Sequence, residues 1–214
     1  MKLIKICVLK NSIFRDTFYS LFDIIYPRSE NSLIFANQLR RILLGKSEGL
    51  RFLKISGFIA NKNSKFSVYQ KINEFSEFEE INESVFQLFL NIKNIDLYYR
   101  SCDANKRFFG TLEAYYPKTY SQDDIILSKN IKLIKKNQHI FSLSSLKLKM
   151  KFILEAKKGI GSFFTPVKRV NYIIEENKLS FSRVVLELET DKRRGCFSST
   201  IDAFKVLNFF ALNM

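Results

Sequence analysis

The amino-acid sequence predicts an α+β fold in which strands outnumber helices. Three segments repeat apolar residues at the spacing of a helix, whereas much of the remaining chain alternates apolar and polar residues as strands do. The chain has 214 residues, of which 46% are hydrophobic, so it can bury one large core or two small ones. These numbers exclude a disordered or collagen-like chain.

Three helices are predicted from apolar periodicity. The first is centred on residues 35–43, and its apolar positions are Phe35, Leu39, Ile42 and Leu43. The second extends from Ile81 to Ile92 with the same pattern. The third begins at about Ser199, because Ser199 and Asp202 have the spacing of a capping box.

Strands are predicted where side chains alternate or where β-branched and aromatic residues are dense. Residues 146–154 alternate apolar side chains with lysines. The other predicted strands are 50–60, 65–70, 164–174 and 181–190. Residues 93–140 are irregular and predict short strands joined by loops. With seven glycines and three prolines, few turn signals mark the ends of these elements.

The sequence offers no catalytic motif. It has no GxSxG, HExxH, P-loop or GxGxxG pattern. His139 is the only histidine, and we expect it to be an ordinary surface or strand residue without a partner. The segment Gly159–Gly161 predicts a turn between two strands, and Asp123 and Asp124 predict solvated turn residues. We therefore expect no active site, cofactor or metal.

The cysteines and the N-terminal residues bear on the cell compartment. Cys7, Cys102 and Cys196 are far apart, which excludes a disulfide framework or a usual zinc site and predicts a reducing compartment. No apolar run reaches the roughly 18 residues of a membrane span. The lysines of the first ten residues, MKLIKICVLK, interrupt any signal-peptide core. We expect no membrane partner.

The charge balance is strongly basic, with 35 basic and 21 acidic side chains and a net charge of +14. Such a charge permits an acidic partner such as nucleic acid. The chain is also rich in Phe, Ile, Lys and Asn and poor in Gly, Ala and Pro. The favoured residues have AT-rich codons, which indicates a plastid, parasite or endosymbiont genome. Part of the lysine excess then reflects codon usage.

Several blocks of the sequence together resemble one protein family. Residues 36–44, ANQLRRILL, closely resemble the GNALRRILL signature of the α subunit of bacterial and plastid RNA polymerase. Residues 74–83 are similar to that family's H-E-[FY]-S-x-[IV]-x-x-V-x-E stretch, and 85–93 (VFQLFLNIK) to its helix ending in LLNLK. Residues 164–172 (FTPVKRVNY) resemble FSPVxxVxY, and 185–190 (VLELET) resemble an IxxxT strand. The blocks follow one another in the family's order.

The resemblance implies a fold of two parts. Residues 1–48 and 162–214 would form a dimerisation domain, and residues 49–161 would form an inserted, mostly-β second domain. Because the chain stops at Met214, the family's C-terminal DNA-binding domain is expected to be absent. Two departures are evident. Residues 30–37 (ENSLIFAN) lack the glycines that usually precede the first helix, and residues 191–196 (DKRRGC) are longer than the family's turn.

The function implied by the resemblance is assembly of DNA-directed RNA polymerase. The chain would pair with a second α-type subunit, most simply an identical copy, and recruit the catalytic β and β′ subunits. It would belong to a nucleotidyltransferase complex without an active site of its own, and it would meet DNA only through that complex. With the AT-rich composition, the resemblance implies a plastid-encoded protein of the chloroplast. The alternative is a basic nucleic-acid-binding protein of ribosomal type.

The resemblance also implies roles for individual residues. The expected β contacts are Asn37, Arg40, Arg41 and Lys93, and the expected β′ contacts are Pro166, Val167, Arg169 and Tyr172. The expected dimer interface is Phe35, Leu39, Ile42, Leu207 and Phe210. For the two arginines the alternative is a solvated helix face, and for the apolar residues it is the protein core. Asn37 is expected to bond to backbone near the helix start.

Overall fold

The computed structural model describes residues 4–14, 16–26, 31–61, 69–99, 107–177 and 181–212. The α+β class is confirmed, because strands make up most of the elements and three α-helices are present in the described ranges. The chain divides into two compact units. The end unit comprises Met1–Gly49 and Gly159–Met214, and the middle unit comprises Leu50–Lys158.

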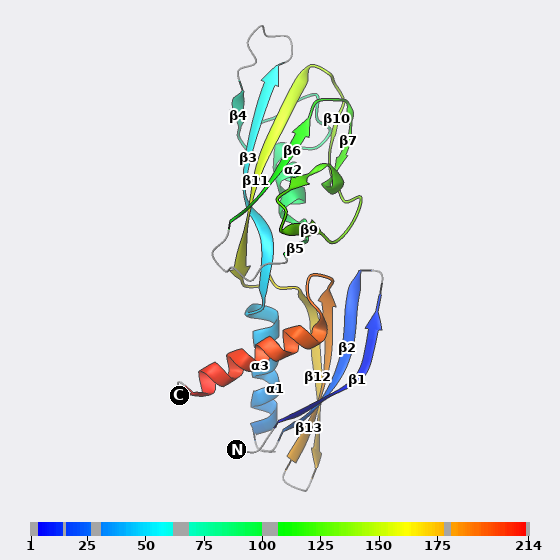
Figure 1. Ribbon diagram of the computed structural model, residues 1–214, viewed down its shortest axis with the longest axis vertical. Helices are drawn as coiled ribbons and strands as arrows, with labels where there is room; N and C mark the ends of the chain where they lie inside the picture. The colour runs from blue at the N-terminus through cyan, green and yellow to red at the C-terminus, as the bar shows by residue number, and fades with distance from the viewer. Residues whose placement is uncertain are drawn as a thin grey trace. The chain divides into compact units, whose positions relative to one another are not determined.

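The end unit contains a four-stranded antiparallel sheet (Figure 1). In spatial order its strands are β1 (Lys5–Ile13), β2 (Thr17–Tyr26), β13 (Phe181–Asp191) and β12 (Val167–Asn177). The central pair joins segments that are far apart in the chain, with Phe22 opposite Leu186 and Ile24 opposite Val184. All four of these side chains are completely buried. The core of the end unit therefore depends on both ends of the chain.

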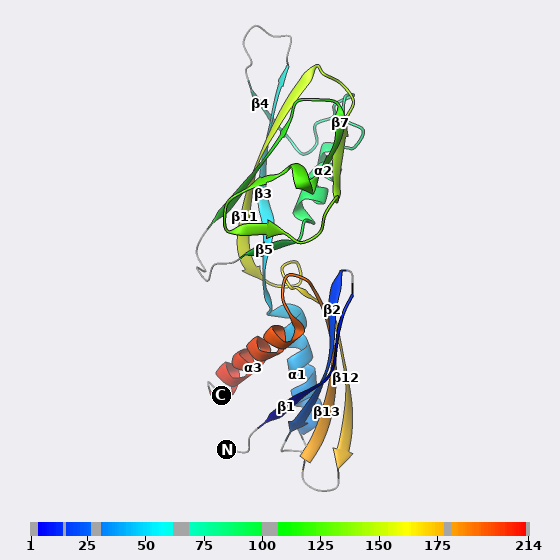
Figure 2. The same ribbon diagram turned by 45° about the vertical axis from the view of Figure 1, so that its right-hand side comes forward.

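Two helices, α1 (Ser32–Gly45) and α3 (Cys196–Leu212), cover one face of this sheet (Figure 2). α1 buries Leu39 and Leu43 completely, as its apolar periodicity predicts. The two helices also contact each other, and the rings of Phe35 and Phe204 lie 6.0 Å apart, centroid to centroid. The predicted first helix is thus confirmed and extends by about one turn at its N-terminal end.

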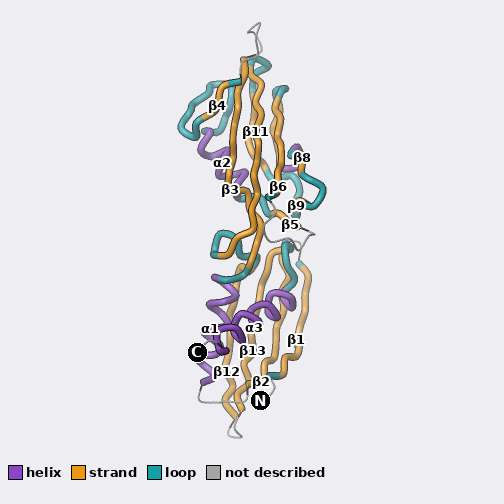
Figure 3. Tube along the Cα trace, turned by 60° about the vertical axis from the view of Figure 1, so that its left-hand side comes forward, coloured by secondary structure: helices purple, strands orange, loops and turns teal. Residues whose placement is uncertain are grey.

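The middle unit is built around a seven-stranded sheet and a two-stranded sheet (Figure 3). The larger sheet has the order β8–β6–β11–β3–β5–β9, and β4 pairs with β3. Its strands are β3 (Glu48–Asn61), β4 (Gln70–Ile72), β5 (Leu97–Tyr99), β6 (Phe108–Ala114), β8 (Ile126–Leu127), β9 (Ile131–Leu133) and β11 (Leu148–Ile160). The smaller sheet pairs β7 (Lys118–Ser121) with β10 (His139–Leu143).

Helix α2 (Val85–Lys93) packs its apolar side into the core of the middle unit. Aromatic rings occupy much of that core. Phe141 stacks on Tyr120 at a centroid distance of 5.0 Å and meets Phe152 edge to face at 5.9 Å. Such ring pairs add about 1 kcal/mol each beyond their buried area. This aromatic cluster therefore packs β7, β10 and β11 against one another.

The starts of two predicted helices differ from the structure. α2 begins after Ser84, whose hydroxyl caps the helix by accepting from the backbone N–H of Gln87, so Ile81 lies outside the helix. α3 begins at Cys196, so Ser199 lies within the helix and the predicted capping box there is wrong. The Ser199 hydroxyl instead donates to the carbonyl of Gly195, which precedes the helix. The predicted strand 65–70 falls largely on residues outside the described ranges. In the described ranges no helix is both long and apolar enough to span a membrane.

Candidate functional site

The outward side of α1 carries the polar part of the ANQLRRILL motif. Asn37, Arg40 and Arg41 are exposed, whereas Leu39 and Leu43 of the same motif are buried. Neither arginine has an ion-pair partner among the described residues. A guanidinium offers a planar fork of donors that suits bidentate binding of a carboxylate. The outward side of α1 therefore presents two cationic groups that a carboxylate could bind.

Asn37 is held from the neighbouring strand. The hydroxyl of Tyr172 on β12 donates to the side-chain oxygen of Asn37 across 2.6 Å. Asn37 was expected to bond to backbone near the helix start, but its side chain instead accepts from the Tyr172 hydroxyl. The contact places a residue of the expected β set directly beside one of the expected β′ set.

The other residues of the FTPVKRVNY block differ in exposure. Pro166 is buried, and Val167 is 4% exposed in the core of the end unit. The Arg169 side chain is 62% exposed, and its guanidinium lies 3.8 Å from the carboxylate of Glu187. Of the four expected β′ contacts, Arg169 and Tyr172 are thus the two that present polar atoms at the surface.

A buried ion pair that the sequence reasoning missed lies beside this block. The guanidinium of Arg193 lies 2.6 Å from the carboxylate of Asp191, with side chains 4% and 5% exposed. Arg193 also donates to the carbonyls of Phe164 at 3.1 Å and Thr165 at 2.7 Å. The backbone N–H of Asp191 donates to the Pro166 carbonyl at 2.8 Å. The only sign of this pair in the sequence was that residues 191–196 (DKRRGC) are longer than the family's turn. In the structure, Asp191 and Arg193 of this segment hold residues 164–166 in place.

Glycines permit the close packing around the same segment. A Cβ on Gly49 would lie 1.8 Å from the carbonyl oxygen of Phe164, and one on Gly159 would lie 2.5 Å from its ring. Gly161 has φ +128°, and its carbonyl accepts from the N–H groups of Phe164 and Thr165, both at 3.0 Å. The turn predicted at Gly159–Gly161 lies slightly later in the chain, because β11 extends to Ile160 and the turn occupies residues 161–164. The conformation of Gly161 disfavours any residue with a side chain.

The residues expected at a dimer interface lie mainly inside the chain's own core. Leu39 is completely buried, Phe35 and Ile42 are each 8% exposed, and Leu207 is partly buried. The side chain of Phe210 lies outside the described residues. Their contact with a second subunit stays a prediction.

Other apolar side chains of the same two helices do reach the surface. Leu33 and Ile34 on α1 are each 57% exposed, and Phe197 and Ile201 on α3 are 53% and 37% exposed. The sequence reasoning missed them because it followed the apolar stripe that fills the core. The sequence could have indicated them, because these four apolar residues occupy positions outside the buried stripe, where polar residues are usual.

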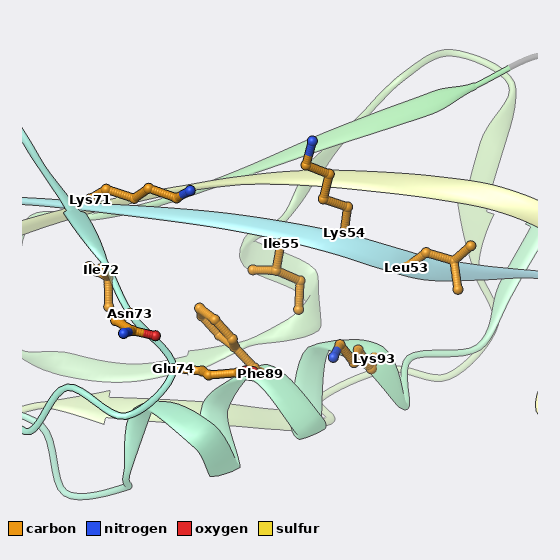
Figure 4. Close-up of a pocket in the computed structure, with 9 residues that line it drawn as sticks. All are labelled: Leu53, Lys54, Ile55, Lys71, Ile72, Asn73, Glu74, Phe89 and Lys93. Carbon is orange, nitrogen blue, oxygen red and sulfur yellow. The ribbon is translucent and has the colours of Figure 1, made fainter.

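Lys93, the fourth expected β contact, belongs to the middle unit. It ends α2 and lines an open groove of about 530 Å³ (Figure 4). The groove is lined by Leu53, Lys54, Ile55, Lys71, Ile72, Asn73, Glu74, Phe89 and Lys93. Lys93 and the α1 arginines therefore lie on separate units.

The residues considered for chemistry have structural partners. Nε2 of His139 lies 2.6 Å from Oε1 of Glu83, so the expectation that His139 lacks a partner is wrong. Asp124 lies in the 3₁₀ helix η2 (Gln122–Asp124) and pairs with Lys118 at 2.6 Å. In the described ranges, no three His, Cys, Asp or Glu residues group closely enough to hold a metal ion. Cys102 lies outside the described residues, whereas Cys7 is exposed and Cys196 is buried.

Comparison with known proteins gives a consistent set of relatives, although no family model matches the chain. The DNA-directed RNA polymerase subunit alpha of Euglena stellata is 32% identical over 210 residues, which cover 97% of this chain and 98% of the relative. The corresponding subunit of Euglena myxocylindracea is 33% identical over 210 residues, covering 97% and 96%. For that of Chlorokybus atmophyticus, 27% identity over 231 residues covers 96% of this chain and 67% of the relative. The similarity extends over both units.

Proposed function

The chain belongs to the family of DNA-directed RNA polymerase α subunits, and from this membership we propose that it is a non-catalytic assembly subunit. In this role it pairs with a second α-type subunit and recruits the β and β′ subunits. The end unit serves as the dimerisation and assembly part, and the middle unit is its insert. The observation that carries the proposal is the pair of exposed arginines, Arg40 and Arg41, within a motif that resembles the family signature.

The β contact centres on α1. Arg40 and Arg41 stand on a helix whose opposite side is locked into the sheet, so their backbone positions are fixed before a partner arrives. A preformed surface loses less entropy on binding than a flexible one. Asn37 adds an amide at the same surface. Lys93 is a separate proposed β contact on the middle unit. Acidic side chains of β are the expected counterpart.

The β′ contact centres on the start of β12. Arg169 and Tyr172 supply the exposed polar groups, and Pro166 and Val167 support them from the buried side. The ion pair of Arg193 and Asp191 holds the loop that leads into this strand. The β′ surface is therefore rigid on both sides of residue 166.

The contact with a second α-type subunit uses the exposed apolar side chains of the two helices. Leu33 and Ile34 of α1 and Phe197 and Ile201 of α3 lie on helices that touch each other. A two-fold axis brings the same residues of both subunits together, so these exposed apolar side chains can cover those of the second subunit. Phe35, Leu39 and Ile42 would support this contact from beneath.

The protein is proposed to be encoded and used in a plastid. The relatives that match the chain come from algae of the genera Euglena and Chlorokybus. The AT-rich residue composition of the chain agrees with an organelle genome.

Co-purification tests the assembly role. The tagged chain is co-expressed with the β and β′ subunits of the same genome, and the recovered complex is counted by native mass spectrometry. We expect two copies of an α-type subunit with one β and one β′. Recovery of the dimer without either large subunit would contradict the proposal.

Variants separate the contacts. Arg40→Ala/Arg41→Ala is expected to lower β recovery at least about tenfold while the dimer persists, because buried interface arginines carry much of the binding energy. Lys5→Ala/Lys10→Ala, which removes two exposed lysines of β1, is the matched control. Phe197→Glu/Ile201→Glu should yield monomers by light scattering, whereas Leu9→Glu on β1 should not. Equal β recovery with both double alanine variants would refute the α1 contact.

A further inference from the structure

An interrupted sheet edge in the middle unit forms the back of the groove beside Lys93. β11 pairs along one edge of β3, and β4 lies against the other edge (Figures 1 and 3). β4 pairs with β3 at Gly57–Ile59, and β5 pairs with it at Leu50. Between these two, no described strand pairs with Phe52–Ser56 on that edge. Unpaired backbone groups of this kind are a template for another strand.

The side-chain pattern of β3 changes within the same stretch. Phe52 is buried in the core, and the next residue that packs against it is Ile55, so the inward-facing alternation shifts by one residue. Leu53 and Lys54 are therefore consecutive exposed residues. A shift of this type is typical of a β-bulge, which ends pairing with a neighbouring strand. The opening in the sheet is thus part of how β3 is built.

The groove in front of this edge has a cationic rim and an apolar floor. Lys54 from β3, Lys71 from β4 and Lys93 from α2 supply three positive charges, against the single acidic side chain of Glu74 (Figure 4). None of the three lysines forms an ion pair with a described residue. Figure 4 shows Ile55 directed toward Phe89 of α2 beneath the strand. An anionic chain with apolar side chains matches these surroundings.

We propose that this groove binds an extended acidic segment of a partner protein, which adds a strand to β3 between β4 and β5. Backbone hydrogen bonds to Leu53–Ile55 give register. Carboxylates on one face of the segment meet Lys54 and Lys71, and apolar side chains on its other face meet Ile55 and Phe89. The free stretch accommodates about five residues, the usual length of a strand. The inference rests on the proposed function only in taking the partner to be one of the large subunits that the chain assembles.

A protein segment is favoured over nucleic acid as the occupant. Bases bind single-strand sites by stacking on exposed aromatic faces. The aromatic ring in the groove, Phe89, is only 7% exposed and meets Phe152 edge to face at 6.5 Å. The open edge of β3 instead offers N–H and C=O groups that an extended peptide satisfies.

Fluorescence anisotropy with the purified full-length chain tests the proposal. The probe is a labelled ten-residue peptide of alternating glutamate and valine. A peptide of the same sequence N-methylated at every residue keeps the charge but removes the N–H donors of both strand edges, so it cannot add to a sheet. A labelled single-stranded oligonucleotide tests the other class of ligand. We expect the first peptide to bind, the N-methylated peptide to bind at least about tenfold more weakly, and the oligonucleotide not to compete.

Charge variants locate the site. Lys54→Glu/Lys71→Glu should weaken peptide binding at least about tenfold, whereas Lys129→Glu/Lys147→Glu, which alters two exposed lysines outside the groove, should not. Hydrogen exchange should show protection of residues 53–55 when the peptide is bound. Equal binding of the N-methylated peptide, equal effects of the two variant pairs, or displacement by the oligonucleotide would overturn the proposal. Because these assays contain no polymerase subunit, their failure is distinct from failure of the complex to co-purify.

Discussion

The hydroxyl of Tyr172 on β12 donates a 2.6 Å hydrogen bond to the side-chain oxygen of Asn37 on α1. The two residues are 135 positions apart in the chain. Each belongs to a different expected partner surface, so the proposed β and β′ contacts adjoin within one subunit. A substitution in one of these surfaces is therefore expected to alter the stability of the other.

Removing the Tyr172 hydroxyl tests this coupling. Tyr172→Phe should lower the free energy of unfolding by about 1 kcal/mol or less, because the hydrogen bond is accessible to water. Asn37→Ala should cost a similar amount, and the double variant should cost less than the sum. Urea unfolding of the four proteins measures the cycle. Strict additivity would contradict the coupling. Tyr98→Phe, at an exposed position of β5, is the control.

Arg193→Met should destabilise the end unit strongly. The variant leaves the Asp191 carboxylate buried without its cation and frees two backbone carbonyls, which together cost about 3–5 kcal/mol. Arg193→Lys should recover only part of this loss, because an ammonium cannot form the same fork of hydrogen bonds. Denaturant unfolding is the measurement. Arg194→Met removes a more exposed ion pair with Asp202 and should cost under about 1 kcal/mol, so equal losses would argue against the clamp.

Two glycine substitutions test the close approach at the start of β3. Gly49→Ala places a methyl group 1.8 Å from the carbonyl oxygen of Phe164, so the backbone must move, at a cost of about 2 kcal/mol or more. Gly45→Ala meets no atom within 4 Å and should be neutral or stabilising by up to about 1 kcal/mol. Thermal unfolding of both variants distinguishes them. A stable Gly49→Ala protein would be inconsistent with the backbone packing described.

The middle unit should show an alkaline-sensitive tyrosine. Tyr115 donates a 2.6 Å hydrogen bond to Glu113, and this bond to a carboxylate raises the pKa of Tyr115 from 10.0 to about 12. The resulting stabilisation is fully present below pH 10.0 and is lost as the pH rises through about 12. Ultraviolet titration of tyrosinate, compared with Tyr115→Phe, measures it. In Glu113→Gln the ionisation should shift back toward 10.0, and an unchanged titration would exclude the bond as the cause.

The acid side of the same cluster has the opposite sign. Hydrogen bonds from Lys151 and Tyr115 lower the pKa of Glu113 below its ordinary 4.5. Its contribution to stability is present above pH 4.5 and is lost as the pH falls through the lowered value. In Lys151→Met the free energy of unfolding should therefore depend less on pH below 4.5, as acid unfolding of the two proteins would measure.

Much of the fold is predictable because periodicity reports burial directly. The spacing of Leu39 and Leu43 predicts a helix with one buried side, and the alternation before Leu154 predicts a strand. The α3 boundary was wrong because Ser199 has a capping residue's type but lies inside the helix. The type of a side chain suggests where a helix is capped, whereas the backbone conformation around Gly195 determines where α3 begins.

The candidate site was predictable only in part. The motif identifies Arg40 and Arg41, and the helical period places them opposite the buried face. Arg193 could not be assigned in this way, since its neighbours Phe164 and Thr165 are distant in sequence. Lys54, Lys71 and Lys93 likewise line one groove only because β3, β4 and α2 pack together.

The sequence by itself determines the α+β class, the helix faces and, through its ordered motifs, membership of the polymerase α family. These properties follow from local spacing and residue type. The tertiary structure alone decides that Tyr172 reaches Asn37, that Arg193 and Asp191 form a buried pair, and that part of the β3 edge is open. These features depend on pairing between distant segments, and such pairing is set by the packing of the complete core rather than by any local pattern.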